Sequence, residues 1–406
     1  MSQSSPPEMS QDLSRVRLAA KFRDQEDFSR DYSPLYARLF GLVASWLEAP
    51  EADDDWVANW LVAAGRDRRS LEVTLLLAAG LHRDVLASEP AARELRRFFP
   101  TVGGAEPLDS PELDVALRQA ILARPDVLAE FIRDAQVQTN ETGRGLSWLL
   151  PLLLTGWPSV RLVDFGASAG LNLVAEQRAY RLLEADSRTT LLDLGLSRTL
   201  QFQTLCYGWQ PNFSGVNGRT LPHIVARDGC DLVPFPLKTR HDELTLMAFV
   251  WGDQVNRLTR LQEGIAAFKQ VDQSDAPVRL TSADLPDELT LFLRDSFARQ
   301  LLMDADSTVP VVIYNTWMTS YLRDKGQSMA AHIDQWATGQ KRPVLWLQWE
   351  PPRDGSQPPH YGWCAWTADL WRGEERNRWH FGWIHPHGGE ARLGRGLEEW
   401  RRFWSD

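Results

Sequence analysis

Cysteine is scarce in this sequence, and apolar runs long enough to cross a membrane are missing. Only three cysteines, Cys206, Cys230 and Cys364, occur in 406 residues, and none belongs to a C-x-x-C pair. This pattern argues against a disulfide framework and against a zinc knuckle, and it predicts free thiols in a reducing compartment. The polar residues 1–12 lack the apolar segment of a signal peptide. We therefore expect a cytoplasmic protein without a membrane partner.

Positive charge is also in deficit, because 44 lysines and arginines stand against 54 acidic residues and leave a net charge of −10. A nucleic-acid-binding protein normally shows a basic patch, so we do not expect a nucleic-acid partner. What is present is an ordinary globular composition, 43% hydrophobic and 24% charged, with 18 tryptophans that are expected to pack in the core. The length suits two or three domains.

The first part of the chain, residues 15–155, is predicted to be a helical domain that follows a disordered tail at 1–14. Ser33 and Pro34 are typical of a helix start, with a serine cap and a proline at the first helical position. Apolar residues follow at helical spacing, and prolines separate the predicted helices. We expect this domain to cover the carboxyl edge of the sheet described next.

Strands and helices alternate from residue 156 to 406, which predicts an α/β domain with a mostly parallel sheet. We expect about seven strands, the last two forming an antiparallel hairpin within 361–385. Five predicted strands end in polar residues, namely Asp164, Asp231, Asp284, Asn315 and Glu350. Because ligands of open parallel sheets bind at the carboxyl edge, these side chains mark the predicted site.

A turn of small residues follows the first of these strands, in the stretch from Val160 to Leu173. Gly166, Ser168 and Gly170 alternate there, and small residues let a ligand approach the backbone closely. We expect a helix after Gly170 whose free amide groups point outward. A phosphate-binding loop would need Gly-Lys-Ser/Thr and a dinucleotide site G-x-G-x-x-G, and neither pattern is present.

The segment Asp164-Phe-Gly166-Ala-Ser168-Ala-Gly170 resembles the first motif of class I, Rossmann-like methyltransferases, D-x-G-x-G-x-G, with serine at the central glycine. The resemblance implies that a Rossmann-like domain binds S-adenosylmethionine through this turn. Asp164 would hold the turn or the cofactor's ammonium group. Asp231, with Glu184 as the alternative, would bind the ribose hydroxyls. The predicted cofactor-binding residues are Asp164, Gly166, Ser168, Gly170, Asn172, Asp231, Asp284 and Asn315.

The methyl acceptor is expected to be a small molecule. If the transfer needs a general base, Glu350 and Tyr314 are candidates, and His223, His385 and His387 remain open beside them. The histidines at 380–387 are interpreted as part of a loop rather than as a metal site. The residues predicted to line the acceptor site are Tyr36, Asn140, Glu141, Arg144 and Trp317.

Two other interpretations stay open. The first is a Rossmann-like protein that binds a ligand without catalysis, because Ser168 replaces the central glycine of the motif. The second is an α/β hydrolase, because Gly166-Ala-Ser168-Ala-Gly170 also fits the G-x-S-x-G nucleophile turn. Ser168 would then be the nucleophile. The triad would be completed by Asp253 or Asp284 and by His332 or His385.

Three motifs resemble an uncharacterised bacterial family, domain-of-unknown-function family 2332. They are Ser33-Pro-Leu-Tyr36, Gln138-Thr-Asn-Glu-x-x-Arg144 and Val163–Leu173. The resemblance extends over nearly the whole chain, and it implies a bacterial, cytoplasmic protein without bringing an activity.

Overall fold

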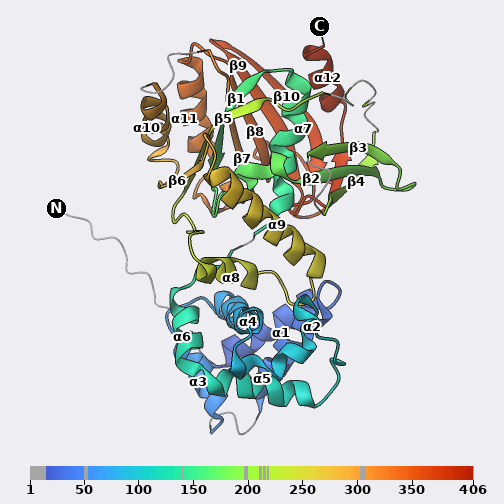
Figure 1. The fold of residues 1–406 in the computed structure, drawn as a ribbon, viewed down its shortest axis with the longest axis vertical. Helices are drawn as coiled ribbons and strands as arrows, with labels where there is room; N and C mark the ends of the chain where they lie inside the picture. Colours follow the sequence, from blue (N-terminus) through green and yellow to red (C-terminus); the bar gives the residue numbers. More distant parts are fainter. Residues whose placement is uncertain are drawn as a thin grey trace, which may run out of the picture. The chain divides into compact units, whose positions relative to one another are not determined.

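The chain forms two compact units in the computed structural model (Figure 1). The structure describes residues 15–49, 54–138, 140–195, 200–209, 213, 216, 219–301 and 308–405, without the side chains of 298–301. The predicted tail at 1–14 lies outside these residues. The first unit comprises Met1–Asn140 and Lys238–Thr259, and the second comprises Glu141–Leu237 and Arg260–Asp406. Each unit is described by itself below.

The first unit is helical, as predicted for the amino-terminal part of the chain. Helix α4 packs against the helices α1, α6 and α8 in it. The last of these comes from later in the chain and completes the helical core. The helices are α1 (Arg15–Ser29), α2 (Pro34–Glu48), α3 (Trp56–Ala64), α4 (Ser70–Leu86), α5 (Glu112–Ala123), α6 (Pro125–Asp134) and α8 (Arg240–Ala248).

The start of α2 is joined to the segment that follows α8. Ser33 caps the helix by accepting a hydrogen bond from the amide of Tyr36 at 3.3 Å. Its hydroxyl donates to both carboxylate oxygens of Asp253, at 2.6 and 2.7 Å. The buried ring of Tyr36 stacks on Trp251, with ring centroids 4.9 Å apart. The Ser33–Tyr36 motif is therefore a packing motif of this unit.

Replacing Ser33 by alanine is expected to lower the free energy of unfolding by about 1–2 kcal/mol, because the helix loses its cap and Asp253 loses a donor. Denaturant unfolding of the full chain measures this change. Thr338→Ala is the matched control, since that exposed hydroxyl donates to the carbonyl of Asp334 in its own helix. Equal stability of both variants would contradict the role given to Ser33.

The second unit is built on one mixed sheet, which has eleven strands in the described residues rather than the expected seven or so. Six neighbouring pairs are parallel and four are antiparallel. The order is β3-β2-β4-β11-β10-β9-β8-β7-β1-β5-β6. The strands are β1 (Ser159–Phe165), β2 (Ala179–Glu184), β3 (Thr190–Gly195), β4 (Phe202–Gly208), β5 (His223–Asp231), β6 (Val278–Ser282), β7 (Val311–Thr316), β8 (Val344–Glu350), β9 (Cys364–Arg372), β10 (Glu375–Ile384) and β11 (Glu390–Leu393).

Five consecutive strands of the sheet, β6-β5-β1-β7-β8, are mutually parallel. The chain moves from β1 through β5 to β6 on one side and places β7 and β8 on the other, so the strand order reverses between β1 and β7. Helices α10 (Leu289–Leu301) and α11 (Gln327–Thr338) pack on one face through Phe292, Met329 and Ile333. Helix α7 (Leu146–Thr155) contacts β7 and β8.

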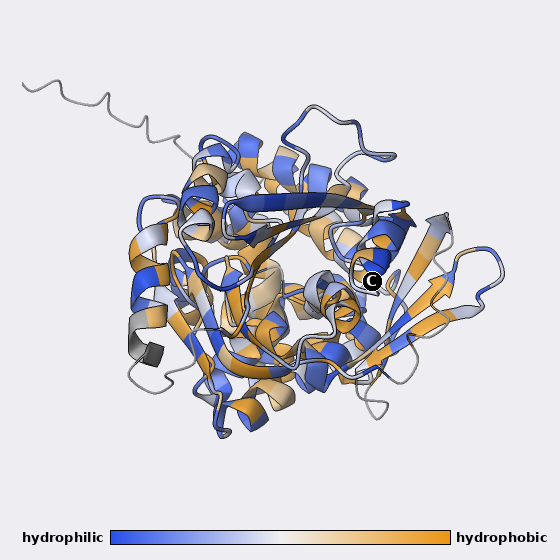
Figure 2. Cartoon of the chain, turned by 90° about the horizontal axis from the view of Figure 1, so that it is seen from above, coloured by the Kyte–Doolittle hydropathy of each residue, from blue (hydrophilic) through white to orange (hydrophobic). Residues whose placement is uncertain are grey.

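Two further helices belong to this unit, and the second of them buries one side and exposes the other. Helix α9 (Val255–Asp272) enters the unit at Arg260, and α12 (Gly396–Phe403) closes the chain. In α12 Leu397 and Trp400 are buried, while Glu398, Glu399, Arg401 and Arg402 carry charge. Both hydropathy colours accordingly appear along this helix beside the carboxyl terminus in Figure 2. Such a pattern is what a helix packed by one side requires.

The segment after Gly170 differs from the prediction. Instead of a helix that reaches about Tyr180, a short 3-10 helix, η5 (Leu171–Gln177), leads into β2. Strand pairing of β2 with β3 and β4 decides the outcome, because a short apolar run suits either element and tertiary pairing selects one. Glu184, the alternative residue for binding the ribose hydroxyls, ends β2, several strands away from β1.

Candidate functional site

The predicted polar residues do lie at one edge of the sheet. Asp231 and Glu350 are the last residues of β5 and β8, and Asp164 and Asn315 are the last but one of β1 and β7. Asp284 follows two residues after β6. These five strands are parallel neighbours, so their carboxyl ends meet at the same edge. Ligands of open α/β sheets bind there, at the point where the strand order reverses, which in this chain lies between β1 and β7.

The turn after β1 is held by the end of β5. The amides of Gly166 and Ala167 both donate to the carbonyl of Cys230 at 2.9 Å. The amide of Ser168 donates to Asp231 Oδ2, also at 2.9 Å. The amide of Gly170 donates to the carbonyl of Ala167 within the turn. Four of the five backbone amides from Gly166 to Gly170 are therefore hydrogen-bonded inside the protein. The amides of the turn itself are thus mostly engaged inside the protein, while outward-pointing amides at the start of the following helix stay a prediction.

The glycines of the turn serve the backbone and its packing. Gly166 and Gly170 have φ angles of 81° and 73°, in the left-handed region that glycine tolerates best. A Cβ on Gly166 would lie 2.8 Å from Cβ of Met318. Ser168 also has a positive φ, 50°, which is uncommon for a residue with a side chain. The turn is therefore a constrained structure pressed against the segment after β7.

Asp164 is buried below the turn and bonded to the neighbouring strand. Its Oδ2 accepts a hydrogen bond of 2.7 Å from the hydroxyl of Tyr314, the residue opposite it on β7. Burial raises the pKa of Asp164 to about 7, an effect that the Tyr314 hydroxyl opposes and the Asp231 carboxylate reinforces. Burial also raises the pKa of Tyr314 well above its usual value, so the hydroxyl keeps its proton. A carboxyl group whose pKa lies close to neutral pH is therefore located between β1 and β7, where the strand order reverses.

Glu350 holds the loop after β7. Its carboxylate accepts hydrogen bonds from Asn315 Nδ2 at 2.6 Å, the amide of Met318 at 3.0 Å, and the amide and hydroxyl of Thr319 at 3.1 and 2.7 Å. Burial raises the pKa of Glu350, and these donors oppose the rise. Four donors occupy the four acceptor positions of a carboxylate. In this arrangement Glu350 positions the loop, and its prediction as a general base stays untested.

Two further predictions concern the same loop. Asn315 is fully buried, and its Oδ1 accepts from the indole of Trp346 at 2.6 Å, so both ends of the amide are used inside the protein. Its contact with a cofactor stays a prediction. Trp317 has a φ of 57°, and its amide donates to the carbonyl of Trp349 at 2.8 Å. A large residue in the left-handed region costs free energy and is often found at functional sites.

The motif Glu141-x-x-Arg144 is brought to the same edge. Arg144 is buried and donates to the carbonyls of Pro386 at 3.0 Å and Thr316 at 3.4 Å. Burial lowers the pKa of its guanidinium, while Glu141 opposes this effect. Asn172, just after the turn, donates to the carbonyl of Glu141 at 3.2 Å, and its buried Oδ1 has no hydrogen-bond partner among the described residues. The two motifs thus meet through named contacts that sequence spacing could not show.

Three predicted residues are not part of this network. Tyr36 and Asn140 belong to the first unit, where Tyr36 is in the core and Asn140 donates to the carbonyl of Leu246. Asp284 is exposed, and its amide bonds to Glu288 Oε2 at 2.8 Å. Asp253, considered for a hydrolase triad, also lies in the first unit, where it holds Ser33.

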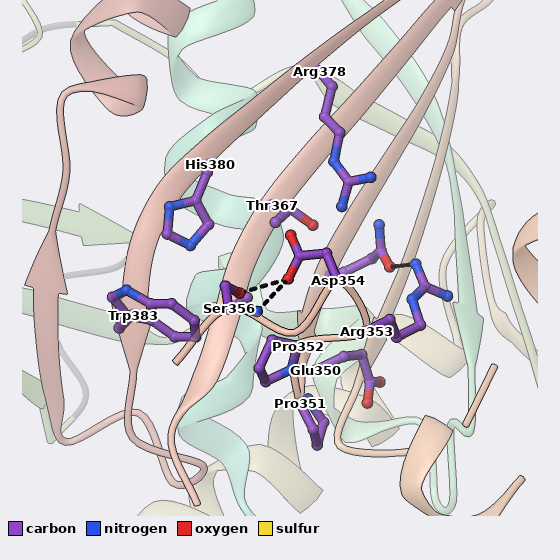
Figure 3. Close-up of a pocket in the computed structure, with 12 residues that line it drawn as sticks. Glu350, Pro351, Pro352, Arg353, Asp354, Ser356, Thr367, Arg378, His380 and Trp383 are labelled. Carbon is purple, nitrogen blue, oxygen red and sulfur yellow. Dashed lines mark hydrogen bonds between the residues drawn. The ribbon is translucent and has the colours of Figure 1, made fainter. Parts of the chain in front are cut away.

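A cavity of about 340 Å³ beyond the end of β8 was not predicted (Figure 3). Charged and aromatic side chains line it, among them Arg353, Asp354, Arg378, His380 and Trp383. Strand β10 carries a basic side chain at every second position, at Arg376, Arg378 and His380. On a predicted hairpin this period of two is the sequence signal that could have indicated this side of the cavity. The loop from Pro351 to Ser356 carries no comparable signal.

Two other features bear on the kind of site. No group of three or more histidine, cysteine, aspartate or glutamate side chains that could hold a metal ion occurs within the described ranges. The described helices include none that is long and apolar enough to span a membrane.

The comparisons with known proteins identify a family. A family model described as an uncharacterised protein conserved in bacteria, DUF2332, matches residues 19–392. Neither the curated proteins nor the solved structures with which the chain was compared include a match. The match covers most of the chain and agrees with the resemblance of the three motifs. The chain therefore belongs to the bacterial DUF2332 family.

Proposed function

We propose that this protein is an S-adenosylmethionine-dependent methyltransferase with a Rossmann-like domain and a small-molecule acceptor. The observation that carries the proposal is the carboxylate of Asp231 at the end of β5, against the glycine turn of β1. Asp231 Oδ2 accepts the amide of Ser168 at 2.9 Å and Oδ1 that of Val233 at 3.2 Å. Each oxygen keeps an acceptor position, which suits the two hydroxyls of a ribose.

The surrounding residues fit such a cofactor. The methyl group of the bound sulfonium is already activated, so the protein needs to align the reactants and exclude water. The loop that Glu350 holds after β7 and the turn that Asp231 holds after β1 would supply this alignment. Asp164, whose pKa burial raises to about 7, lies near the end of β1, just before the turn. Perturbed carboxyl groups of this kind concentrate at functional sites.

Calorimetric titration with S-adenosylmethionine tests the proposal. We expect binding by the wild type and at least about tenfold weaker binding by Asp231→Asn, because one ribose acceptor becomes a donor. Asp287→Asn is the matched control, since this exposed carboxyl group is not at the turn. Absence of binding by the wild type would overturn the proposal.

A ligand-binding role without catalysis is the second candidate. The burial of the two predicted catalytic residues favours it. Glu350 and Tyr314 are both buried and hydrogen-bonded to other groups of the protein. The two candidates separate in one experiment, because both require binding but only the first consumes the cofactor. Incubation with methyl-labelled S-adenosylmethionine and pooled bacterial metabolites should yield a labelled small molecule if the protein is a methyltransferase. Tight binding without label transfer would favour the second candidate.

A further inference from the structure

The cavity beyond β8 differs in character from the edge described above. Its floor is the sheet face formed by Thr367 of β9 and by Arg378, His380 and Trp383 of β10, and its cover is the loop 351–356 (Figure 3). Its volume of about 340 Å³ lies in the range of small-ligand sites. Glu350 also lines the cavity, but its carboxylate is engaged by the loop after β7.

Arg378 brings a positive charge to this cavity, and its ion pair with a carboxylate is long. Its nearest carboxylate is that of Asp369, whose Oδ1 lies 3.9 Å from Arg378 Nε. That carboxylate already accepts Arg376 Nε and Nη2 on Oδ1, at 3.1 and 2.9 Å, and Gln348 on Oδ2. The side chain of Arg378 is 51% exposed. Its terminal nitrogens are therefore available to a ligand.

Asp354 brings a negative charge from the opposite side. Its Oδ1 accepts the amide and the hydroxyl of Ser356, at 3.0 and 2.6 Å, and these hydrogen bonds lower the pKa of Asp354, so it is ionised at neutral pH. Figure 3 shows Asp354 and Arg378 directed into the same space. In the described part of the chain no ion pair within 4.0 Å joins these two residues. A cation and an anion thus face one cavity, where the charge of Arg378 also helps to lower the pKa of Asp354 although no direct ion pair joins them.

We propose that this cavity binds a small zwitterion of the α-amino acid type. The carboxylate binds Arg378, whose planar guanidinium suits two parallel hydrogen bonds, and the ammonium group binds Asp354. The apolar side chain lies against Trp383, Pro351 and Pro352, which supply the hydrophobic lining. A simple anion would meet the repulsion of Asp354, and a simple amine that of Arg378. The site does not depend on the proposed methyltransferase function.

Calorimetric titration of the full chain with L-phenylalanine, in the absence of S-adenosylmethionine, tests this site. We expect binding of phenylalanine, and at least about tenfold weaker binding of phenethylamine and 3-phenylpropionate, which lack the carboxylate and the ammonium group respectively. Arg378→Gln and Asp354→Asn should each weaken phenylalanine binding by a similar factor. Arg294→Gln, an exposed arginine on α10 outside the cavity, is the matched control.

Two outcomes would overturn the proposal. One is equal affinity for phenylalanine and 3-phenylpropionate, which would make the cavity a simple anion site. The other is absence of binding by phenylalanine, leucine and methionine at concentrations on the order of 10 mM, well above a dissociation constant of about 1 mM. Neither outcome bears on S-adenosylmethionine binding at the turn, because Asp231 does not line this cavity.

Discussion

Replacing Glu350 by alanine is expected to lower the free energy of unfolding by about 3–5 kcal/mol. The carboxylate accepts four hydrogen bonds, from Asn315, the Met318 amide, and the amide and hydroxyl of Thr319. Removing it leaves these donors without their acceptor, and such buried donors cost free energy to leave unpaired. The loss exceeds what is gained by no longer burying a carboxylate. The loop from Trp317 to Thr319 should lose its ordered conformation.

Denaturant unfolding of the full chain measures the change. Glu375→Ala is the matched control, because the side chain of this exposed glutamate on β10 accepts a hydrogen bond from Asn377 on its own strand. The loss of unfolding free energy in Glu350→Gln should lie between those of Glu350→Ala and Glu375→Ala. The amide oxygen of glutamine can still accept hydrogen bonds, whereas its amide nitrogen faces other donors. A loss in Glu350→Ala no larger than in the control would show that the carboxylate does not hold the loop. S-Adenosylmethionine binding by Glu350→Gln then reports whether the loop matters for the proposed function.

Replacing Asp164 by asparagine is expected to stabilise the protein above neutral pH, by about 2–4 kcal/mol. Burial raises the pKa of Asp164 from 3.8 to about 7 in the folded state. Between these values the folded chain keeps a proton that the unfolded chain has released. Stability therefore falls as the pH rises from about 4 to 7, and the cost is fully present above that window. Asparagine is never charged and can still accept the hydrogen bond from Tyr314.

Urea unfolding of wild type and Asp164→Asn at pH 4.5 and pH 8 checks this prediction, at about the two ends of the window. The stability difference should be small at the lower pH and large at the higher one. Asp284→Asn is the control, because its carboxyl group is exposed and lies outside the contact between Asp164 and Tyr314. Equal pH dependence of wild type and Asp164→Asn would contradict a raised pKa for Asp164. If Asp164→Asn is more stable but binds S-adenosylmethionine less tightly, the carboxylate is retained for function at the expense of stability.

Prediction succeeded where local pattern and tertiary role agree. β5 and β8 end at Asp231 and Glu350, as predicted, and β7 is the Val/Ile-rich strand that a buried parallel position requires. Polar residues at the ends of these strands could be placed at one edge, because parallel strands share their direction. The ribose candidate, Asp231, could be named for the same reason, although 67 residues separate it from Asp164.

Prediction failed where partners distant in sequence decide the structure. The segment at 171–184 has helical spacing, yet it forms a 3-10 helix and a strand because β3 and β4 pair with it. Glu350 looked like a free carboxylate at a strand end, and only the fold shows four donors around it. The cavity beyond β8 is formed by a loop and two strands together, so no single stretch of sequence predicts the whole cavity.

The residues alone determined the family, the helical start of the chain, the parallel strands and the glycine turn, because each depends on short motifs or on apolar periodicity. The tertiary structure decided the number of strands, the use of the turn's amides and the pairing of Asp164 with Tyr314. It also decided that Arg378 and Asp354 face one cavity. These features depend on contacts between residues far apart in the chain. Such contacts arise only when strands pair and side chains are buried together.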